Sequence, residues 1–191
     1  MRVGVLALQG AFAVHRRRLA ELDVEAPAVR TVAQLAEVDA LVVPGGESTT
    51  MSRLLATNGL FDPVAERIEA GMPVLGTCAG MILCATEVLD ARPDQVPFGV
   101  IDLTVRRNGY GRQLASFEAD LDVAGLDEPF RAVFIRAPKV ERVGADVEVL
   151  AEHDGVPVLL RRRGCTVAAF HPELTPDGRV HRLFVESIEQ R

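Results

Sequence analysis

Residues 73–80 read PVLGTCAG, and this stretch decides the fold. Pro73 opens a short apolar run, and a G-x-C-x-G turn then leads into a helical pattern that begins at Ala79. A tight turn between a buried strand and a helix is the thiol counterpart of the G-x-S-x-G nucleophile elbow. The stretch therefore predicts an α/β protein with a cysteine at the tip of a strand-to-helix turn.

The chain before this stretch alternates between strand and helix patterns. Nearly continuous apolar runs predict strands that are buried on both faces, and apolar stripes predict the helices between them. The predicted strands are residues 3–8, 24–29, 40–43 and 74–76, and the predicted helices are residues 11–22, 49–56, 63–70 and 79–89. This order indicates a mostly parallel sheet with helices on both faces. Ligands bind such sheets at the carboxyl ends of the strands, where the loops 44–49 and 76–80 fall.

The second half of the chain has a different pattern. Short strand-like runs joined by tight turns cover residues 100–106, 113–121, 132–135, 147–151, 156–161 and 165–170. Part of this half is expected to extend the sheet with antiparallel strands. Residues 179–190 then predict a closing amphipathic helix. Since no repeat or linker interrupts the pattern, we expect residues 1–191 to form a single domain.

Composition and charge argue against several classes of protein. The formal net charge is −6, whereas a nucleic-acid binder normally carries a basic excess. No apolar run approaches the roughly 18 residues that span a bilayer, and the first one is too short for a secretion signal. The cysteines number 3 and contain no C-x-x-C pair, which favours free thiols and a cytoplasmic location. The basic runs 16–18 and 161–163 are interpreted as solvated faces or partner contacts.

Cys78 is the candidate nucleophile. The turn presents its side chain at a strand end, and the following helix start favours a thiolate over a thiol. The alternative is a small buried core residue, which is a common role of free cysteine. That alternative is preferred for Cys84, inside the predicted helix, and for Cys165, at the start of an apolar strand.

His171 and Glu173 are the candidate base and its orienting carboxylate. They follow the apolar run 166–170, so their side chains also fall at a strand end. A histidine exchanges protons near neutral pH, and a nearby carboxylate fixes its tautomer. The tripeptide HPE alone is weak evidence for a catalytic pair, since the pattern H-x-E often occurs by chance. No further His or Cys cluster completes a metal site. Ordinary structural roles are preferred for the remaining histidines, which are His15, His153 and His181.

The loop PGGESTT at residues 44–50 is the candidate oxyanion site. Paired glycines permit positive φ and close approach of backbone N–H groups, so a donor from Gly46 and the N–H of Ala79 could hold a tetrahedral oxyanion. A phosphate loop is disfavoured because the G-x-x-x-x-G-K-[ST] pattern is absent. A capping turn, with Ser48 or Thr49 as the N-cap, is an alternative that is compatible with catalysis.

Together these motifs resemble the class I (triad) glutamine amidotransferases, and more specifically the family of glutaminase subunits of pyridoxal 5′-phosphate synthase. The segments that carry the resemblance are LQGA at 8–11, PGGESTTM at 44–51, GTCAG at 76–80, GRQ at 111–113, SFEADL at 116–121, FIRAP at 134–138 and FHPELT at 170–175. The PGG and GTCAG segments mark only the class, whereas GGESTT and FIRAP are much more specific to the subunit.

The resemblance implies a flavodoxin-like three-layer fold and the hydrolysis of L-glutamine to L-glutamate and ammonia, without a cofactor. It implies a protein partner, the synthase subunit PdxS, which uses the ammonia with ribose 5-phosphate and glyceraldehyde 3-phosphate. It also implies that the glutamine site is lined by Gly46, Glu47, Ser48, Arg107, Ile135 and Arg136. An arginine suits the substrate carboxylate, but which of the two binds it stays open.

Two other functions are compatible with the motifs. The chain could serve another synthase, such as imidazole glycerol phosphate synthase, with the same triad, although GGESTT and FIRAP argue against this. It could also be a non-catalytic regulatory subunit, although the presence of all three triad residues argues against a loss of catalytic activity. Gln9 ends the first strand on the face that carries Cys78, so it is a candidate sensor of the partner; the alternative is that it only satisfies backbone groups there.

Overall fold

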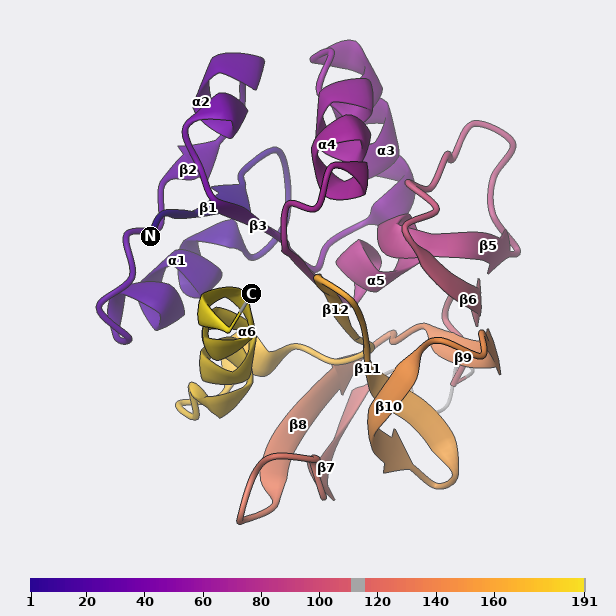
Figure 1. Cartoon of the computed structure of the whole chain (residues 1–191). Helices are drawn as coiled ribbons and strands as arrows, with labels where there is room; N and C mark the ends of the chain where they lie inside the picture. The colour runs from indigo at the N-terminus through magenta and orange to yellow at the C-terminus, as the bar shows by residue number, and fades with distance from the viewer. Residues whose placement is uncertain (111–115, 191) are drawn as a thin grey trace.

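The computed structural model describes residues 1–110 and 116–190, and it has three layers (Figure 1). The helices are α1 (Phe12–Ala20), α2 (Val32–Ala36), α3 (Ser48–Thr57), α4 (Phe61–Glu69), α5 (Ala79–Cys84), the 3-10 turn η1 (Pro172–Leu174) and α6 (Arg179–Glu189). The strands are β1 (Val3–Leu6), β2 (Ala28–Val29), β3 (Ala40–Val43), β4 (Val74–Thr77), β5 (Ala85–Leu89), β6 (Ile101–Arg106), β7 (Ser116–Leu121), β8 (Phe130–Ile135), β9 (Lys139–Val143), β10 (Glu148–His153), β11 (Val156–Arg162) and β12 (Cys165–Ala168).

The central sheet has seven strands in the order β10-β11-β12-β4-β3-β1-β2. The strands from β2 to β12 pair in parallel, and β11 and β10 add an antiparallel extension. The parallel part has the strand order of a flavodoxin-like fold. This confirms the predicted fold class, including the antiparallel extension. Two smaller sheets, β5-β6-β9 and β7-β8, flank the described core.

Alternating side chains of the strands separate the core into two layers. Val5, Val42 and Leu75 face the layer formed with α1 and α6, which contains Leu19 and Phe184. Their neighbours along each strand face α3, α4 and α5 on the other side of the sheet. Figure 1 shows α1 and α6 together on one side of the sheet, with α3 and α4 on the other. A strand that buries both faces needs a nearly continuous apolar sequence, as these strands have.

Several predicted boundaries were wrong. The helix predicted for residues 79–89 ends at Cys84, because Ala85 is extended and β5 then pairs with β6. Of the strand predicted for residues 24–29, only β2 is observed, together with an isolated parallel β-bridge between Glu25 and Arg2. The short helix α2, which Thr31 caps, and strand β9 were not predicted. Of the strand predicted for residues 113–121, β7 is observed, and residues 113–115 lie outside the described residues.

None of the helices within residues 1–110 and 116–190 combines the length and apolar character that crossing a membrane requires.

Candidate active site

Cys78 lies between β4 and α5 in a strained positive-φ conformation, with φ 50° and ψ −102°. Such a conformation costs a non-glycine residue on the order of 1–3 kcal/mol and is typical of functional turns. The backbone N–H of Cys78 donates to Ala168 O at 2.8 Å, which holds the strained residue against β12. Cys78 is 6% exposed, so the thiol is buried at the edge of a cavity and is less open than the sequence suggested.

The two glycines of G-x-C-x-G are required by close packing. A Cβ on Gly76 would lie 2.7 Å from Gly80 O, and a Cβ on Gly80 would overlap Val43 O. The start of α5 therefore sits directly on the ends of β3 and β4. This spacing is what brings the cysteine turn next to the loop that follows β3.

His171 and Glu173 lie at the end of β12, as predicted. His171 Nδ1 lies 2.8 Å from Glu173 Oε1, and both side chains are buried, with Glu173 fully inaccessible. The backbone N–H of His171 donates to Val133 O at 2.8 Å, so β8 fixes the position of the histidine. The structure thus brings together the three predicted triad residues, which are 93 and 95 positions apart along the chain, counted from Cys78 to His171 and to Glu173.

The triad environment favours a charged imidazole. Burial alone lowers the pKa of His171, but hydrogen bonds with Cys78 and with Glu173 outweigh it and raise the pKa to about 10. Burial alone raises the pKa of Glu173, but the hydrogen bond from His171 and the nearby His15 lower it overall. The arrangement can therefore hold an imidazolium between the thiol side and a carboxylate, as a cysteine hydrolase requires.

The PGG loop packs directly on the triad. A Cβ on Gly45 would overlap Cε1 of His171 and would lie 3.3 Å from the Cβ of Cys78. A Cβ on Gly46 would overlap the side-chain oxygen of Gln9. Neither glycine has a positive φ, so the loop does not use the positive φ that paired glycines permit. They are needed because larger residues would not fit between Gln9, Cys78 and His171.

Glu47 is the N-cap of α3, in place of the predicted Ser48 or Thr49. Its carboxylate accepts from the backbone N–H of Thr49 at 3.2 Å and of Thr50 at 2.7 Å. Arg107 donates to the same carboxylate at 3.0 Å. Burial alone raises the pKa of Glu47, but the hydrogen bonds from Thr50 and Thr49 lower it overall. Glu47 therefore fixes the loop and holds Arg107 beside it.

A cavity of about 380 Å³ joins these groups at the carboxyl ends of the strands. Its lining includes Cys78, His171, Gln9 and all six residues expected to bind glutamine, which are Gly46, Glu47, Ser48, Arg107, Ile135 and Arg136. Leu174 and Asn108 also line it and were not predicted. Ala79, the other predicted oxyanion donor, is the first residue of α5 and is 1% exposed. The segment at residues 111–113 lies outside the described residues.

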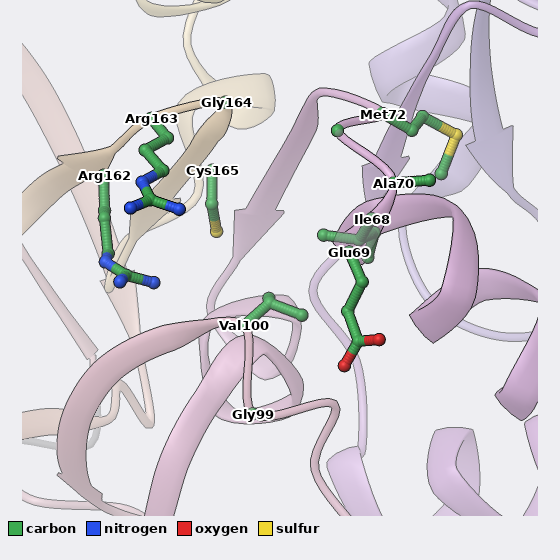
Figure 2. A pocket seen from close by; sticks show the side chains of 11 residues that line it. Ile68, Glu69, Ala70, Met72, Gly99, Val100, Arg162, Arg163, Gly164 and Cys165 are labelled. Carbon is green, nitrogen blue, oxygen red and sulfur yellow. The ribbon is translucent and has the colours of Figure 1, made fainter.

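A second cavity, of about 430 Å³, opens at the amino-terminal edge of β4 and β12. Figure 2 shows Arg162 and Arg163 on one side of it and Glu69 on the other. Arg162 is paired with Asp146 at 2.6 Å, and Arg161 pairs with Glu148 at 2.9 Å. The basic run 161–163 is thus largely engaged in surface ion pairs. This cavity lies at the opposite end of β4 from Cys78 and shares no residue with the triad.

One of the histidines interpreted as ordinary residues, His15, contacts the triad, and a second, His181, contacts His15 at 2.9 Å. His15 and His181 are fully buried, and His15 Nε2 lies 3.3 Å from Glu173 Oε2. Arg18, which was expected on a solvated face or in a partner contact, is buried and donates to Glu173 O at 3.3 Å. The apolar stripe of α1 could place His15 in the core, but nothing in the sequence indicates what it would meet there. His153 lies away from the triad and stacks on Phe117.

The chain matches the SNO glutamine amidotransferase family over residues 5–190. It is 58% identical over 186 residues to the pyridoxal 5′-phosphate synthase subunit PdxT of Mycobacteroides abscessus, an alignment that covers 97% of this chain and 96% of the relative. It is 56% identical over 190 residues to the protein of the same name from Mycolicibacterium vanbaalenii, covering 98% and 97%.

Solved structures agree with this relationship. A crystal structure of a glutamine amidotransferase superposes with a TM-score of 0.93 at 47% identity, covering 99% of this chain and all of that one. A glutamine amidotransferase from Thermotoga maritima superposes with a TM-score of 0.61 at 13% identity, covering all of this chain and 84% of that one, which shows the shared fold alone. On the full-length match and these identities, the chain belongs to the SNO glutamine amidotransferase family.

Proposed function

We propose that this protein is the glutaminase subunit of a pyridoxal 5′-phosphate synthase. It hydrolyses L-glutamine and passes the ammonia to the synthase subunit PdxS, which builds pyridoxal 5′-phosphate from ribose 5-phosphate and glyceraldehyde 3-phosphate. The observation that carries the proposal is the strained Cys78 in one cavity with His171 and the PGG loop, where the buried Glu173 is hydrogen-bonded to His171. The similarity to PdxT proteins over nearly the full length supports the choice of partner.

In the first half-reaction the Cys78 thiolate attacks the side-chain amide carbon of glutamine. A C–S bond forms, and the electron pair of the C=O bond moves to the oxygen. The N–H groups of Gly46 and Ala79 receive this oxyanion; one such donor typically contributes ~3–4 kcal/mol to transition-state stabilisation. The charged His171 then gives its proton to the amide nitrogen, the C–N bond breaks, and ammonia leaves a thioester behind.

In the second half-reaction His171 is neutral and acts as a base. It takes a proton from a water molecule that attacks the thioester carbon. The C–S bond breaks, glutamate leaves, and the Cys78 thiolate and the charged His171 are restored. Glu173 keeps the imidazole oriented and stabilises its charge throughout.

Arg136 is the better placed arginine for the substrate carboxylate. Arg107 is already engaged by Glu47, at 3.0 Å, and shapes the loop. Arg136 lines the same cavity and has no ion pair within the described residues. A guanidinium that is not already neutralised can bind both carboxylate oxygens. We assign the α-carboxylate of glutamine to Arg136, with Glu47, Ser48 and Ile135 completing the site.

The proposal includes three further points. Residues 1–191 act as a single amidotransferase domain, and the protein works in the cytoplasm. The chemistry above uses only the side chains and backbone donors of this chain, so it requires no cofactor. Pyridoxal phosphate is the product of the partner subunit.

A glutaminase assay tests the proposal. Ammonia and glutamate release are measured for the chain alone, with PdxS, and with the partner subunit of imidazole glycerol phosphate synthase. We expect release to rise with PdxS only, and Cys78→Ala to abolish it while the fold survives. Activation by the other synthase would favour the alternative amidotransferase. A folded wild type that never hydrolyses glutamine would favour a regulatory subunit.

A further inference from the structure

Glu173 has two carboxylate oxygens, and only one of them faces His171. Oε1 lies 2.8 Å from His171 Nδ1, whereas the buried Oε2 has no hydrogen bond of good geometry within the described residues. Leaving a buried carboxylate oxygen without a donor is costly, so the groups around Oε2 determine how firmly Glu173 is held.

His15 of α1 faces that second oxygen. Its Nε2 atom lies 3.3 Å from Glu173 Oε2 and 3.2 Å from Thr77 Oγ1. Thr77 directly precedes Cys78 at the end of β4. His15 therefore bridges the strand that carries the nucleophile and the carboxylate that orients the base.

His181 of α6 fixes the tautomer of His15. His15 Nδ1 lies 2.9 Å from His181 Nε2, and one of these two nitrogens must donate. If His15 donated, its Nε2 would present a lone pair to the carboxylate. His181 would then bury an N–H at Nδ1, which has no partner within the described residues. If His181 donates from Nε2, its Nδ1 carries a lone pair, and only this acceptor is left without a partner within the described residues. His15 then carries its hydrogen on Nε2, and this N–H faces Thr77 and Glu173. The second arrangement costs less because it leaves no buried donor unpaired.

The charge state of the two rings agrees with this arrangement. Burial is the main cause that lowers the pKa of His15 to about 4 and that of His181 to about 3. Both rings are therefore neutral at neutral pH and carry one N–H each. Among the residues that the structure describes, the charged groups around Glu173 are His171 and Arg18, and the hydrogen bond from Arg18 goes to the backbone oxygen of Glu173, at 3.3 Å.

We propose that His15, oriented by His181, is a positioning residue of the triad: its Nε2–H is shared between Thr77 Oγ1 and Glu173 Oε2 and keeps the carboxylate aimed at His171. The inference rests on the proposed function, because it assigns His15 a part in the same reaction. It acts through Glu173 and does not touch the substrate.

The test compares His15→Met with His15→Gln in the complex with PdxS. Methionine has a similar volume but no N–H, whereas the glutamine amide can donate to Glu173 and accept from His181. We expect His15→Met to lower kcat roughly tenfold or more while KM for glutamine stays within about twofold, because misplacing a catalytic group affects the transition state most. We expect His15→Gln to recover most of the loss.

The pH profile of kcat distinguishes a positioning role from a merely structural one, because a structural role of His15 would leave the profile unchanged. Losing the donor makes Glu173 a stronger base, which raises its own pKa and that of the paired His171. The acidic limb of the profile should therefore shift to higher pH in His15→Met and stay near the wild-type position in His15→Gln. In a Glu173→Gln background, His15→Met should have little further effect, because the two act as a unit.

Several outcomes would overturn the proposal. They are a folded His15→Met variant with wild-type kcat and acidic limb, a His15→Gln variant as impaired as His15→Met, or full additivity with Glu173→Gln. If His15→Met does not fold, His181→Met provides the test, since it removes only the donor that sets the tautomer of His15. This variant should shift the acidic limb of the pH profile in the same direction, but by less. An unchanged acidic limb would again overturn the proposal. A wild-type complex without glutaminase activity would instead refute the proposed function.

Discussion

The side-chain oxygen of Gln9 accepts a hydrogen bond from the backbone N–H of Glu47 at 2.9 Å. This contact ties the β1–α1 connection, which begins after Leu6, to the loop that follows β3, and the missing side chain of Gly46 leaves the room for it. The next peptide back is anchored too, because Gly45 O accepts from the N–H of Ala11 at 3.2 Å. The two hydrogen bonds thus attach the peptides 45–46 and 46–47 of the loop 44–50, the candidate oxyanion site, to the β1–α1 connection.

Replacing Gln9 should uncouple this loop from the partner. Ammonia released without an acceptor wastes glutamine, so we expect the wild type to be weakly active alone and activated by PdxS. Turning the Gly45–Gly46 peptide would cost the bond to Ala11, about 1 kcal/mol, which docking could supply. We expect Gln9→Ala to respond less to PdxS, as measured by glutaminase assays with and without it. A fully active lone wild type would refute the switch, and a normal response of Gln9→Ala would exclude Gln9 as its sensor.

A methyl group on Gly46 should damage the oxyanion site without unfolding the protein. Gly46→Ala would push the Gln9 amide away from the backbone N–H of Glu47 and so release the loop, and we expect kcat to fall about 100-fold, as for loss of one oxyanion donor. Gly178→Ala is the matched control, because a Cβ there would meet nothing nearer than Leu22 at 3.8 Å. Equal kcat values in the two variants would argue against the assigned donor.

Alkylation by a glutamine-like electrophile should modify Cys78 first. Cys78 borders the active-site cavity, whereas Cys84 is fully buried and Cys165 is 4% exposed. A hydrogen bond with Cys84, together with burial, raises the pKa of Cys165 and so suppresses its thiolate. Peptide mapping by mass spectrometry locates the label. A label found mainly on Cys84 or Cys165 would contradict the assignment of the nucleophile.

His171→Asn should reduce activity more than Glu173→Gln. The histidine moves protons in both half-reactions, whereas the glutamate orients and stabilises it. Steady-state kcat values in the PdxS complex measure the difference. Equal losses would indicate that the pair acts as a tighter unit, since triad effects are often non-additive. A greater loss in Glu173→Gln would reverse the two roles.

The buried histidines should make the protein sensitive to acid. Their folded pKa values, about 4 for His15 and about 3 for His181, lie below the unfolded value of 6.5. The unfolded state therefore binds more protons below pH 6.5, and stability that is complete above this pH is lost as the pH falls toward 4 for His15 and toward 3 for His181. Urea unfolding at several pH values should show that His181→Leu reduces this slope by about 1.4 kcal/mol per pH unit. An unchanged slope would contradict the burial of a neutral His181.

Much of the candidate site could be predicted from the sequence because the reactive residues lie at strand ends. Cys78, His171 and the PGG loop each follow an apolar run, and parallel strands bring their carboxyl ends to one edge. The misassigned parts have a common cause. Cap choice at Glu47 and the end of α5 at Cys84 depend on neighbours distant in sequence, namely Arg107 and the strand β6.

The sequence by itself determined the fold class, the family and the identity of the candidate triad, because burial patterns and turn residues are local properties of the chain. Only the tertiary structure decided what surrounds the triad. It placed His15 of α1 against Glu173 and His181 of α6 against His15, and it placed the loop 44–50 against Gln9. The physical reason is that helix packing on the sheet brings these groups together across 158 and 166 positions, counted from His15 to Glu173 and to His181. No local pattern encodes which buried polar groups will satisfy one another.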